Sequence, residues 1–197
     1  MSPLILASGS PRRKQLLRQA GFDFEIRLPR IPERADAHLS PRELTSWNAV
    51  RKGLHVARLH PDMVVIAADT VVALGNTIIG KPADARNAVR ILEKLSGRTH
   101  QVYTSVFVAH LARTKVNLFC AISDVHFRKL GAHQIRDYLA RIDPLDKAGA
   151  YAAQGYGTQI IKRIDGSYSN VVGLPMEQTT TVLGKFGIRP NKNRSPK

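Results

Sequence analysis

Apolar residues along this chain are grouped in two ways, as short unbroken runs and as stripes at helical spacing. Residues 4–7 form an unbroken run, which is typical of a strand buried on both faces. Ser10 and Pro11 follow as an N-cap and a first helical residue, and apolar positions at the spacing of one helix face come next. The same order of run and stripe recurs along the sequence. The pattern therefore predicts an α/β protein.

The other predicted elements follow from the same signals. A capping box, Ser40-Pro41-Arg42-Glu43, opens a helix that extends to about Leu59. Residues 64–68 are an unbroken apolar run, so we expect a buried strand that ends at Asp69. Further strands are predicted at residues 24–28, 71–74, 77–79, 102–111, 118–127 and 159–164. Further helices are predicted between Asp84 and Gly97, at residues 135–142 and at residues 176–186. Long strands without a helix between them indicate a mixed sheet.

The composition limits the class of protein and its partners. The chain has 197 residues, 43% of them hydrophobic, which is enough for one domain with a substantial core. The formal net charge of +15 favours anionic partners. The cations are spread along predicted helices, and no zinc finger, basic zipper or RNA-binding aromatic signature is present, so we expect small anionic ligands and no nucleic acid. We expect a domain at residues 1–188 and a basic, disordered tail at 189–197.

Membrane and export signals are missing from the sequence. No run reaches the roughly 18 to 20 apolar residues that span a bilayer, and the N-terminal residues do not have the regions of a signal peptide. We therefore expect no membrane association and a cytoplasmic location. The single cysteine, Cys120, excludes an internal disulfide and a cysteine-based zinc site.

The motif Ser8-Gly9-Ser10-Pro11-Arg12-Arg13 joins the first strand to the first helix. Its small residues let backbone amides approach a ligand closely, and the helix N-terminus adds free N–H groups and a partial positive charge. Arg12 and Arg13 oppose the helix dipole there, at a cost of about 0.3 to 1 kcal/mol. A bound phosphate would reverse this cost, since arginine binds phosphate oxygens in a bidentate way. The alternative is an ordinary capped helix with solvated arginines.

Two motifs follow in the middle of the chain. Asp69 ends a predicted buried strand, and such carboxylates commonly lie at the ligand crevice of α/β sheets. It would be a metal ligand, a general base or both; the alternative is a turn or capping residue. The segment from Gly75 to Lys81 resembles a P-loop, but Pro82 replaces the magnesium-binding hydroxyl and a predicted hairpin strand lies in between. Lys81 is a candidate for neutralising phosphate charge, or else a solvated turn residue.

Weaker signals come from three other places. Glu33 lies in a polar loop and Lys52 inside a helix, and neither is informative alone. Asp146 and Lys147 precede small residues that permit close approach to a ligand, and a turn does not account for this charged pair. Taken together, the motifs supply the cations, backbone amides and carboxylates that a metal-assisted polyphosphate site requires.

These motifs, in this order, resemble the Maf family of nucleoside triphosphate pyrophosphatases over nearly the whole chain. The segments that carry the resemblance are Leu4-Ile5-Leu6-Ala7-Ser8-Gly9-Ser10-Pro11-Arg12-Arg13, Ala68-Asp69-Thr70, Gly80-Lys81-Pro82, Leu95-Ser96-Gly97 with His100, Asp146-Lys147-Ala148-Gly149-Ala150-Tyr151 and Asn170-Val171-Val172-Gly173-Leu174-Pro175. The resemblance implies an elongated mixed β-sheet with flanking helices, two lobes around a central cleft, and a fold similar to that of inosine triphosphatases. It implies hydrolysis of dTTP and UTP, or of modified pyrimidine nucleotides, to the monophosphate and pyrophosphate, and it suggests a homodimer.

The resemblance also implies roles for particular residues. Asp69 resembles the catalytic acidic residue of the family, with Lys81 and Glu33 as further catalytic residues, and Glu33 and Asp69 as ligands of Mg²⁺ or Mn²⁺. The implied substrate-binding residues are Ser8, Arg12, Arg13, Lys52, Thr70 and Gln154. Among them Arg12, Thr70 and Gln154 occupy positions where, in the dTTP/UTP-hydrolysing branch of the family, the residue type correlates with the nucleotide base that is accepted.

The chain departs from the family pattern at three positions. Pro32 stands where another acidic residue is usual, which leaves one carboxylate fewer for a metal. Asn48 and Gly53 replace the usual leucine and alanine around Lys52.

The expected reaction is in-line attack of water on the α-phosphorus, with Asp69 accepting the proton and the cations stabilising charge on the pyrophosphate. Two other functions stay open from the sequence: a nucleotide-binding regulator of cell division without turnover, and a basic nucleic-acid-binding protein. Measuring pyrophosphate release from a panel of nucleotides distinguishes these two functions from a nucleoside triphosphate pyrophosphatase.

Overall fold

The computed structural model of the protein describes residues 4–32 and 38–191. The chain divides into two compact units. One unit consists of Met1–Asp69, Thr104–Ala121 and Gly173–Lys197, and the other of Thr70–Tyr103 and Ile122–Val172.

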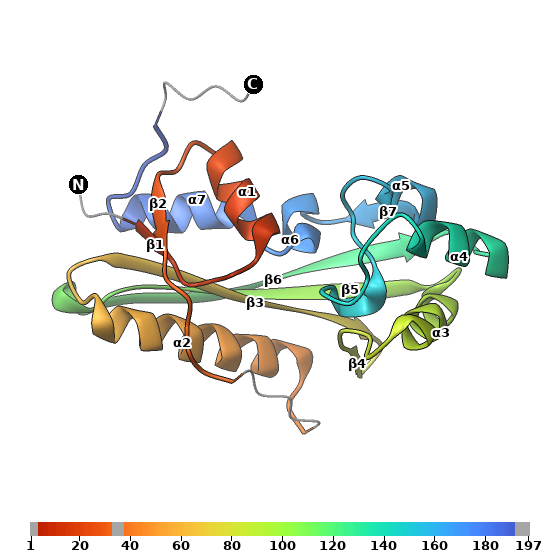
Figure 1. Ribbon diagram of the computed structural model, residues 1–197. Coiled ribbons are helices and arrows are strands. Elements are labelled where there is room, and N and C mark those ends of the chain that lie inside the picture. The colour runs from red at the N-terminus through yellow and green to blue at the C-terminus, as the bar shows by residue number, and fades with distance from the viewer. Residues whose placement is uncertain (1–3, 33–37, 192–197) are drawn as a thin grey trace. The chain divides into compact units, whose positions relative to one another are not determined.

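The strands form a mixed, seven-stranded sheet in the order β2-β1-β3-β5-β6-β7, with β4 paired to β3 outside this path (Figure 1). Their bounds are β1 Leu4–Leu6, β2 Phe24–Ile26, β3 Val64–Leu74, β4 Thr77–Ile79, β5 Thr99–His110, β6 Lys115–Phe127 and β7 Ile161–Asp165. β1 runs parallel to β2 and β3, whereas the pairs β3–β4 and β6–β7 are antiparallel. The predicted mixed sheet with flanking helices is confirmed. The long strands β3, β5 and β6 contribute residues to both units.

The first unit contains α1 (Pro11–Gln19), η1 (Leu111–Arg113), the long helix α2 (Pro41–Leu59) and α7 (Met176–Lys185). Figure 1 shows α2 on one face of the strands and α1 and α7 on the other. The core beneath α2 consists of small and branched side chains and one phenylalanine, contributed by the helix and the strands. Its buried members are Ile5, Ala7, Ala49, Val56, Ala57, Val65, Ala67, Phe107 and Ala109.

Gly53 lets α2 lie directly on this core. A methyl group at Gly53 would be 2.3 Å from Cδ1 of Phe107 and 3.3 Å from Cβ of Ala67. Glycine inside a helix costs up to about 1 kcal/mol relative to alanine, but any larger residue would collide with the Phe107 ring. The glycine at this position of α2 is therefore explained by the phenylalanine opposite.

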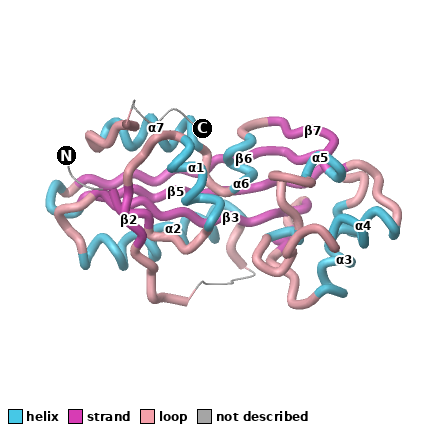
Figure 2. Tube along the Cα trace, turned by 45° about the horizontal axis from the view of Figure 1, so that its top comes forward, coloured by secondary structure: helices cyan, strands magenta, loops and turns pink. Residues whose placement is uncertain are grey.

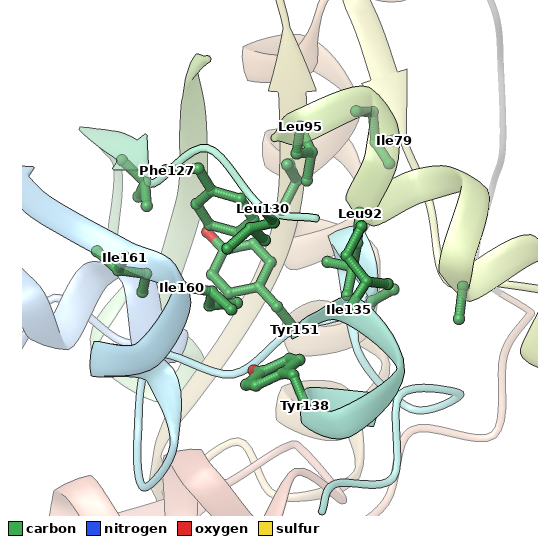
Figure 3. Close-up of a cluster of buried hydrophobic side chains, with 14 of the residues drawn as sticks. Ile79, Leu92, Leu95, Phe127, Leu130, Ile135, Tyr138, Tyr151, Ile160 and Ile161 are labelled. Carbon is green, nitrogen blue, oxygen red and sulfur yellow. The ribbon is translucent and has the colours of Figure 1, made fainter. Parts of the chain in front are cut away.

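The second unit contains five short helical segments, shown as helices in Figure 2. They are α3 (Ala85–Leu95), α4 (Ala132–Leu139), η2 (Ala148–Ala150), α5 (Gly157–Ile160) and α6 (Tyr168–Val172). Figure 3 shows the cluster of apolar side chains between them and their strands. Leu92 and Leu95 of α3 and Ile135 and Tyr138 of α4 are all 1% exposed or less, so both helices are held by burial of one apolar face.

A buried aromatic cluster in this unit includes one histidine. His100 makes edge contacts with Phe127 and Tyr151, at ring-centroid distances of 4.8 and 5.3 Å. Nε2 of His100 lies 2.8 Å from the Tyr151 hydroxyl. Burial, with a smaller contribution from His126, lowers the pKa of His100 to about 4, so its imidazole is neutral at pH 7.

Most predicted elements are confirmed, with end points that differ by a few residues. Ser10 caps α1, Ser40 and Glu43 form the predicted capping box of α2, and Asp84 caps α3. The predicted hairpin turn at Gly75-Asn76 joins β3 to β4, with Leu74 paired to Thr77.

Two predicted element boundaries are wrong. β3 does not end at Asp69 but continues to Leu74, because the following Thr70 and Val71 favour a strand and the Asp69 carboxylate is satisfied from α2. Residues 157–160 form α5, so β7 begins at Ile161 and not at residue 159. Gly157 permits this turn, since a Cβ there would be 2.7 Å from the Ala152 carbonyl oxygen.

The C-terminal segment begins in a defined position. The amide of Asn191 donates to the carbonyl of Gly21 at 2.8 Å, while residues 192–197 of the predicted tail lie outside the described residues. In the part of the chain that the structure describes, no helix combines the length and the apolar character that crossing a bilayer requires.

Candidate active site

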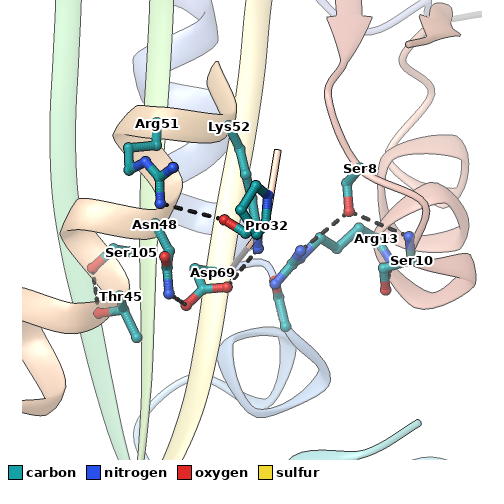
Figure 4. Close-up of polar contacts among 11 residues, drawn as sticks. Ser8, Ser10, Arg13, Pro32, Thr45, Asn48, Arg51, Lys52, Asp69 and Ser105 are labelled. Atoms are coloured by element: carbon teal, nitrogen blue, oxygen red, sulfur yellow. Dashed lines mark hydrogen bonds and ion pairs between the residues drawn. The ribbon is translucent and has the colours of Figure 1, made fainter. Parts of the chain in front are cut away.

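The carboxylate of Asp69 lies inside β3 and faces α2. Val65 and Ala67 belong to the core beneath α2, and Asp69 is the next residue in the same alternation, so its side chain points to the same helix. Nζ of Lys52 donates to Oδ1 of Asp69 at 2.7 Å, and Nδ2 of Asn48 donates to Oδ2 at 3.3 Å (Figure 4). The Lys52 and Asp69 side chains are 9% and 10% exposed. Both carboxylate oxygens therefore have a protein donor in a nearly buried environment.

Helical spacing brings the two donors together. Asn48 and Lys52 are four residues apart on α2, which places them on one face, a turn apart. Thr45, one turn before Asn48, lies on the same face and shares a hydrogen bond of 2.7 Å with the Ser105 hydroxyl. Lys52 was expected from the family resemblance, but Asn48 was noted only as a departure from the family. Its position four residues before Lys52, on the same face of α2, was the signal for a role at the site.

The loop after β1 leaves the sheet close to Asp69. β1 pairs with β3 as far as Leu6 opposite Ile66, and the amide of Ala7 donates to the Ile66 carbonyl at 2.8 Å. The topology thus starts the predicted phosphate-binding loop from the strand that pairs with β3, the strand that holds Asp69.

Arg13 is anchored by two of the motifs that the sequence singled out. Its Nε donates to the carbonyl of Gly173 at 2.9 Å, and its Nη1 donates to the Ser8 hydroxyl at 3.1 Å. Figure 4 shows Arg13 extending from α1 in the direction of Lys52 and Asp69. These bonds account for a cation in the first turn of a helix without a phosphate, so the position of Arg13 is by itself no evidence of an anion. Arg12 beside it is half-buried.

The second unit holds the other predicted substrate-binding residues. Lys81 is exposed just after β4, and Thr70 and Gln154 are half-buried. The amide of Gly149 donates to the carbonyl of Gly80 at 3.0 Å, which brings the Gly80-Lys81-Pro82 turn against the segment that contains Gly149. Two of the sequence motifs therefore meet within this unit. That these residues act on the same substrate as Asp69 stays a prediction.

Asp146 and Lys147 contact each other. Nζ of Lys147 donates to the Asp146 carboxylate and, at 2.5 Å, to the carbonyl of Asp143. The pair therefore closes the loop that precedes η2, a structural role that the sequence alone did not indicate.

Comparison with known proteins identifies the family. A family model described as Maf-like protein matches residues 3–186. The chain belongs to the Maf family. A dTTP/UTP pyrophosphatase of Bacillus pumilus is 44% identical to this Maf protein, with 96% of this chain and 100% of the relative covered. One of Pelotomaculum thermopropionicum is 43% identical, with 95% and 98% covered.

Solved structures resemble this Maf protein more distantly. The dITP/XTP pyrophosphatase of Mycobacterium abscessus has a TM-score of 0.44 at 13% identity, with 93% of this chain and 94% of that chain covered. The Ham1 protein of Staphylococcus aureus has a TM-score of 0.48 at 14% identity, with 93% and 99% covered. Both scores are low, and the family assignment rests on the sequence matches.

Of the two metal ligands predicted for this Maf protein, Glu33 and Asp69, only Asp69 belongs to the described residues. Glu33 lies outside the described residues. Within residues 4–32 and 38–191, no group of three His, Cys, Asp or Glu side chains is placed to hold a metal ion. Magnesium in nucleotide enzymes is usually bound by one or two carboxylates together with substrate phosphates. A single carboxylate such as that of Asp69 is compatible with a metal bound in this way.

Proposed function

We propose that this Maf protein hydrolyses dTTP and UTP, modified pyrimidine nucleotides included, to the monophosphate and pyrophosphate. The observation that carries the proposal is the nearly buried Asp69 carboxylate, hydrogen-bonded by Lys52 and Asn48 beside the end of β1. The family resemblance expects the catalytic acidic residue, which acts as the base, at this position. The relatives named dTTP/UTP pyrophosphatases, at 41 to 44% identity over nearly their whole length, support the same reaction and substrates.

Asp69 accepts the proton of the water that attacks the α-phosphorus. The Lys52 ammonium compensates the negative charge of the buried Asp69 carboxylate. The same ammonium also stabilises the negative charge that develops on the leaving pyrophosphate. No covalent intermediate is required, because water is the nucleophile.

Ser8, Arg12 and Arg13 bind the triphosphate at the N-terminus of α1. The helix end contributes free N–H groups and a partial positive charge. The bonds of Arg13 to Gly173 and Ser8 hold its guanidinium in place before substrate arrives, which lowers the entropic cost of binding. Lys81 adds a further cation, and Arg12, Thr70 and Gln154 select the base.

A divalent cation, Mg²⁺ or Mn²⁺, bound by Asp69, Glu33 and the phosphates would neutralise developing charge and make water more acidic. We further propose that the protein works in the cytoplasm, as the sequence analysis predicts, and as a homodimer, as the family resemblance implies. Nucleic acid is not a proposed partner.

The proposal is tested with a panel of canonical and modified nucleoside triphosphates in the presence of Mg²⁺, with monophosphate and pyrophosphate measured together. Equal amounts of the two products, formed fastest from dTTP and UTP, are expected. Tight nucleotide binding without either product would instead identify a regulator that does not turn over. Salt-sensitive binding of DNA with no pyrophosphate released would identify a nucleic-acid-binding protein.

A further inference from the structure

Asn48 contacts the carboxylate of Asp69 from a buried position on α2. Its Nδ2 donates to Oδ2 at 3.3 Å, whereas Lys52 occupies Oδ1 at 2.7 Å (Figure 4). Asn48 is 4% exposed.

The hydrogen bond from Asn48 restricts the orientation of the Asp69 carboxylate, which the bond from Lys52 alone does not. The terminal torsion of aspartate is broad and roughly two-fold, so one contact leaves the plane of the carboxylate free to turn. The lysine ammonium is a compact charge with three rotatable donors, so it can keep its hydrogen bond to one carboxylate oxygen while the carboxylate plane rotates. Two donors on different oxygens, from successive turns of one helix, do fix it. The backbone of α2, which carries both Asn48 and Lys52, is held in position because Gly53 lets it pack directly against Phe107.

The buried amide of Asn48 between α2 and β3 is unfavourable unless it forms a hydrogen bond. Burial of a polar group costs free energy that only hydrogen bonding recovers. Ala49, Val56 and Ala57 on the same helix are buried and apolar, so a leucine at position 48 would pack without needing a partner.

We infer that Asn48 is a positioning residue, which fixes the plane of the Asp69 carboxylate so that its remaining lone pairs always face the reacting water. The inference rests on the proposed function. It assigns Asn48 no contact with substrate.

The test compares Asn48→Leu with Thr45→Val in steady-state hydrolysis of dTTP. Thr45 is buried on the same face of α2 but bonds to Ser105, so its substitution controls for a general disturbance of the helix. Loss of a hydrogen-bond partner that orients a metal-binding side chain typically lowers activity about 10- to 100-fold, and we expect a loss of the same order here. Asn48→Leu should lower kcat by such a factor and leave KM within about twofold of the wild-type value, because only the orientation of a reacting group has changed. Thr45→Val should leave both constants unchanged.

A second comparison shows whether Asn48 acts through Asp69. In an Asp69→Asn background, adding Asn48→Leu should cause no further loss of kcat, because the group that it orients is already gone. The inference is overturned if Asn48→Leu alone keeps full kcat, if Thr45→Val lowers kcat equally, or if the loss repeats undiminished in the Asp69→Asn background. Failure of the proposed function gives a different result, namely an Asp69→Asn variant as active as the wild type.

Discussion

Nζ of Lys52 and Oδ1 of Asp69 are 2.7 Å apart, and the two side chains are 9% and 10% exposed. Removal of one partner from a buried pair leaves an uncompensated charge, which typically costs about 3 to 5 kcal/mol of stability. Lys52→Met should lower the free energy of unfolding by that amount in denaturant titrations.

Arg27 is the matched control for this substitution. It pairs with Glu25 at 2.5 Å, but both side chains are about half exposed. Arg27→Met should change the free energy of unfolding by less than about 1 kcal/mol. Equal effects of the two substitutions would show that the Lys52–Asp69 pair is not buried in solution.

Gly53 and Gly184 should respond in opposite directions to substitution by alanine. The Cβ of Gly53→Ala would overlap the Phe107 ring, and such overpacking costs about 1 to 3 kcal/mol. Among the described residues, no atom beyond the neighbouring residues and backbone of α7 lies within 4 Å of the Cβ position at Gly184, so Gly184→Ala should gain up to about 1 kcal/mol from helix propensity. Thermal unfolding of both variants measures the difference. Adding Phe107→Leu should recover part of the loss in Gly53→Ala, and a stabilising Gly53→Ala would contradict the close packing of α2.

His100 should make the protein less stable as the pH falls from 6.5 to 4. Burial lowers its pKa to about 4 in the native state, against 6.5 when unfolded, so in this range the unfolded chain binds a proton that the native chain does not. The free energy of unfolding should fall by at most about 3 kcal/mol across this window and then level off. His100→Gln should abolish this part of the pH dependence. His133→Gln should keep it, because the His133 side chain is 82% exposed.

Arg13 should not be replaceable by lysine. A lysine has one nitrogen and cannot donate to Gly173 and Ser8 while it also presents a planar fork to phosphate. Arg13→Lys should lower kcat/KM for dTTP at least about tenfold, equivalent to about 1.4 kcal/mol of transition-state stabilisation. The exposed Arg18 on the same helix is the control, and Arg18→Lys should leave kcat/KM unchanged.

Local signals in the sequence predicted the parts of the fold that depend on a few neighbouring residues. The capping box of Ser40 and Glu43 and the turn at Gly75-Asn76 are satisfied within three or four residues, so spacing alone locates them. The end of β3 was misplaced because a charged residue inside a strand is tolerated only with a partner. That partner, Lys52, lies 17 residues earlier in the chain.

The site was predicted less completely than the fold. Local motifs indicated Asp69 and Arg13, and the family resemblance added Lys52, but the bond from Arg13 to Gly173 joins residues 160 positions apart and has no local signal. Asn48 was missed as a contributor because one amide on a helix is usually solvated. Only the packing of α2 on β3 shows that it meets a carboxylate.

The most direct test of the central claim is the release of pyrophosphate from dTTP by the wild-type protein and by Asp69→Asn, with circular dichroism to show that both are folded. Asp62→Asn, an exposed carboxylate just before β3, serves as the control. The account predicts one pyrophosphate for each dTMP, full activity in Asp62→Asn, and a loss of about 100-fold or more in a folded Asp69→Asn. Release of orthophosphate in place of pyrophosphate, or undiminished turnover in Asp69→Asn, would contradict it.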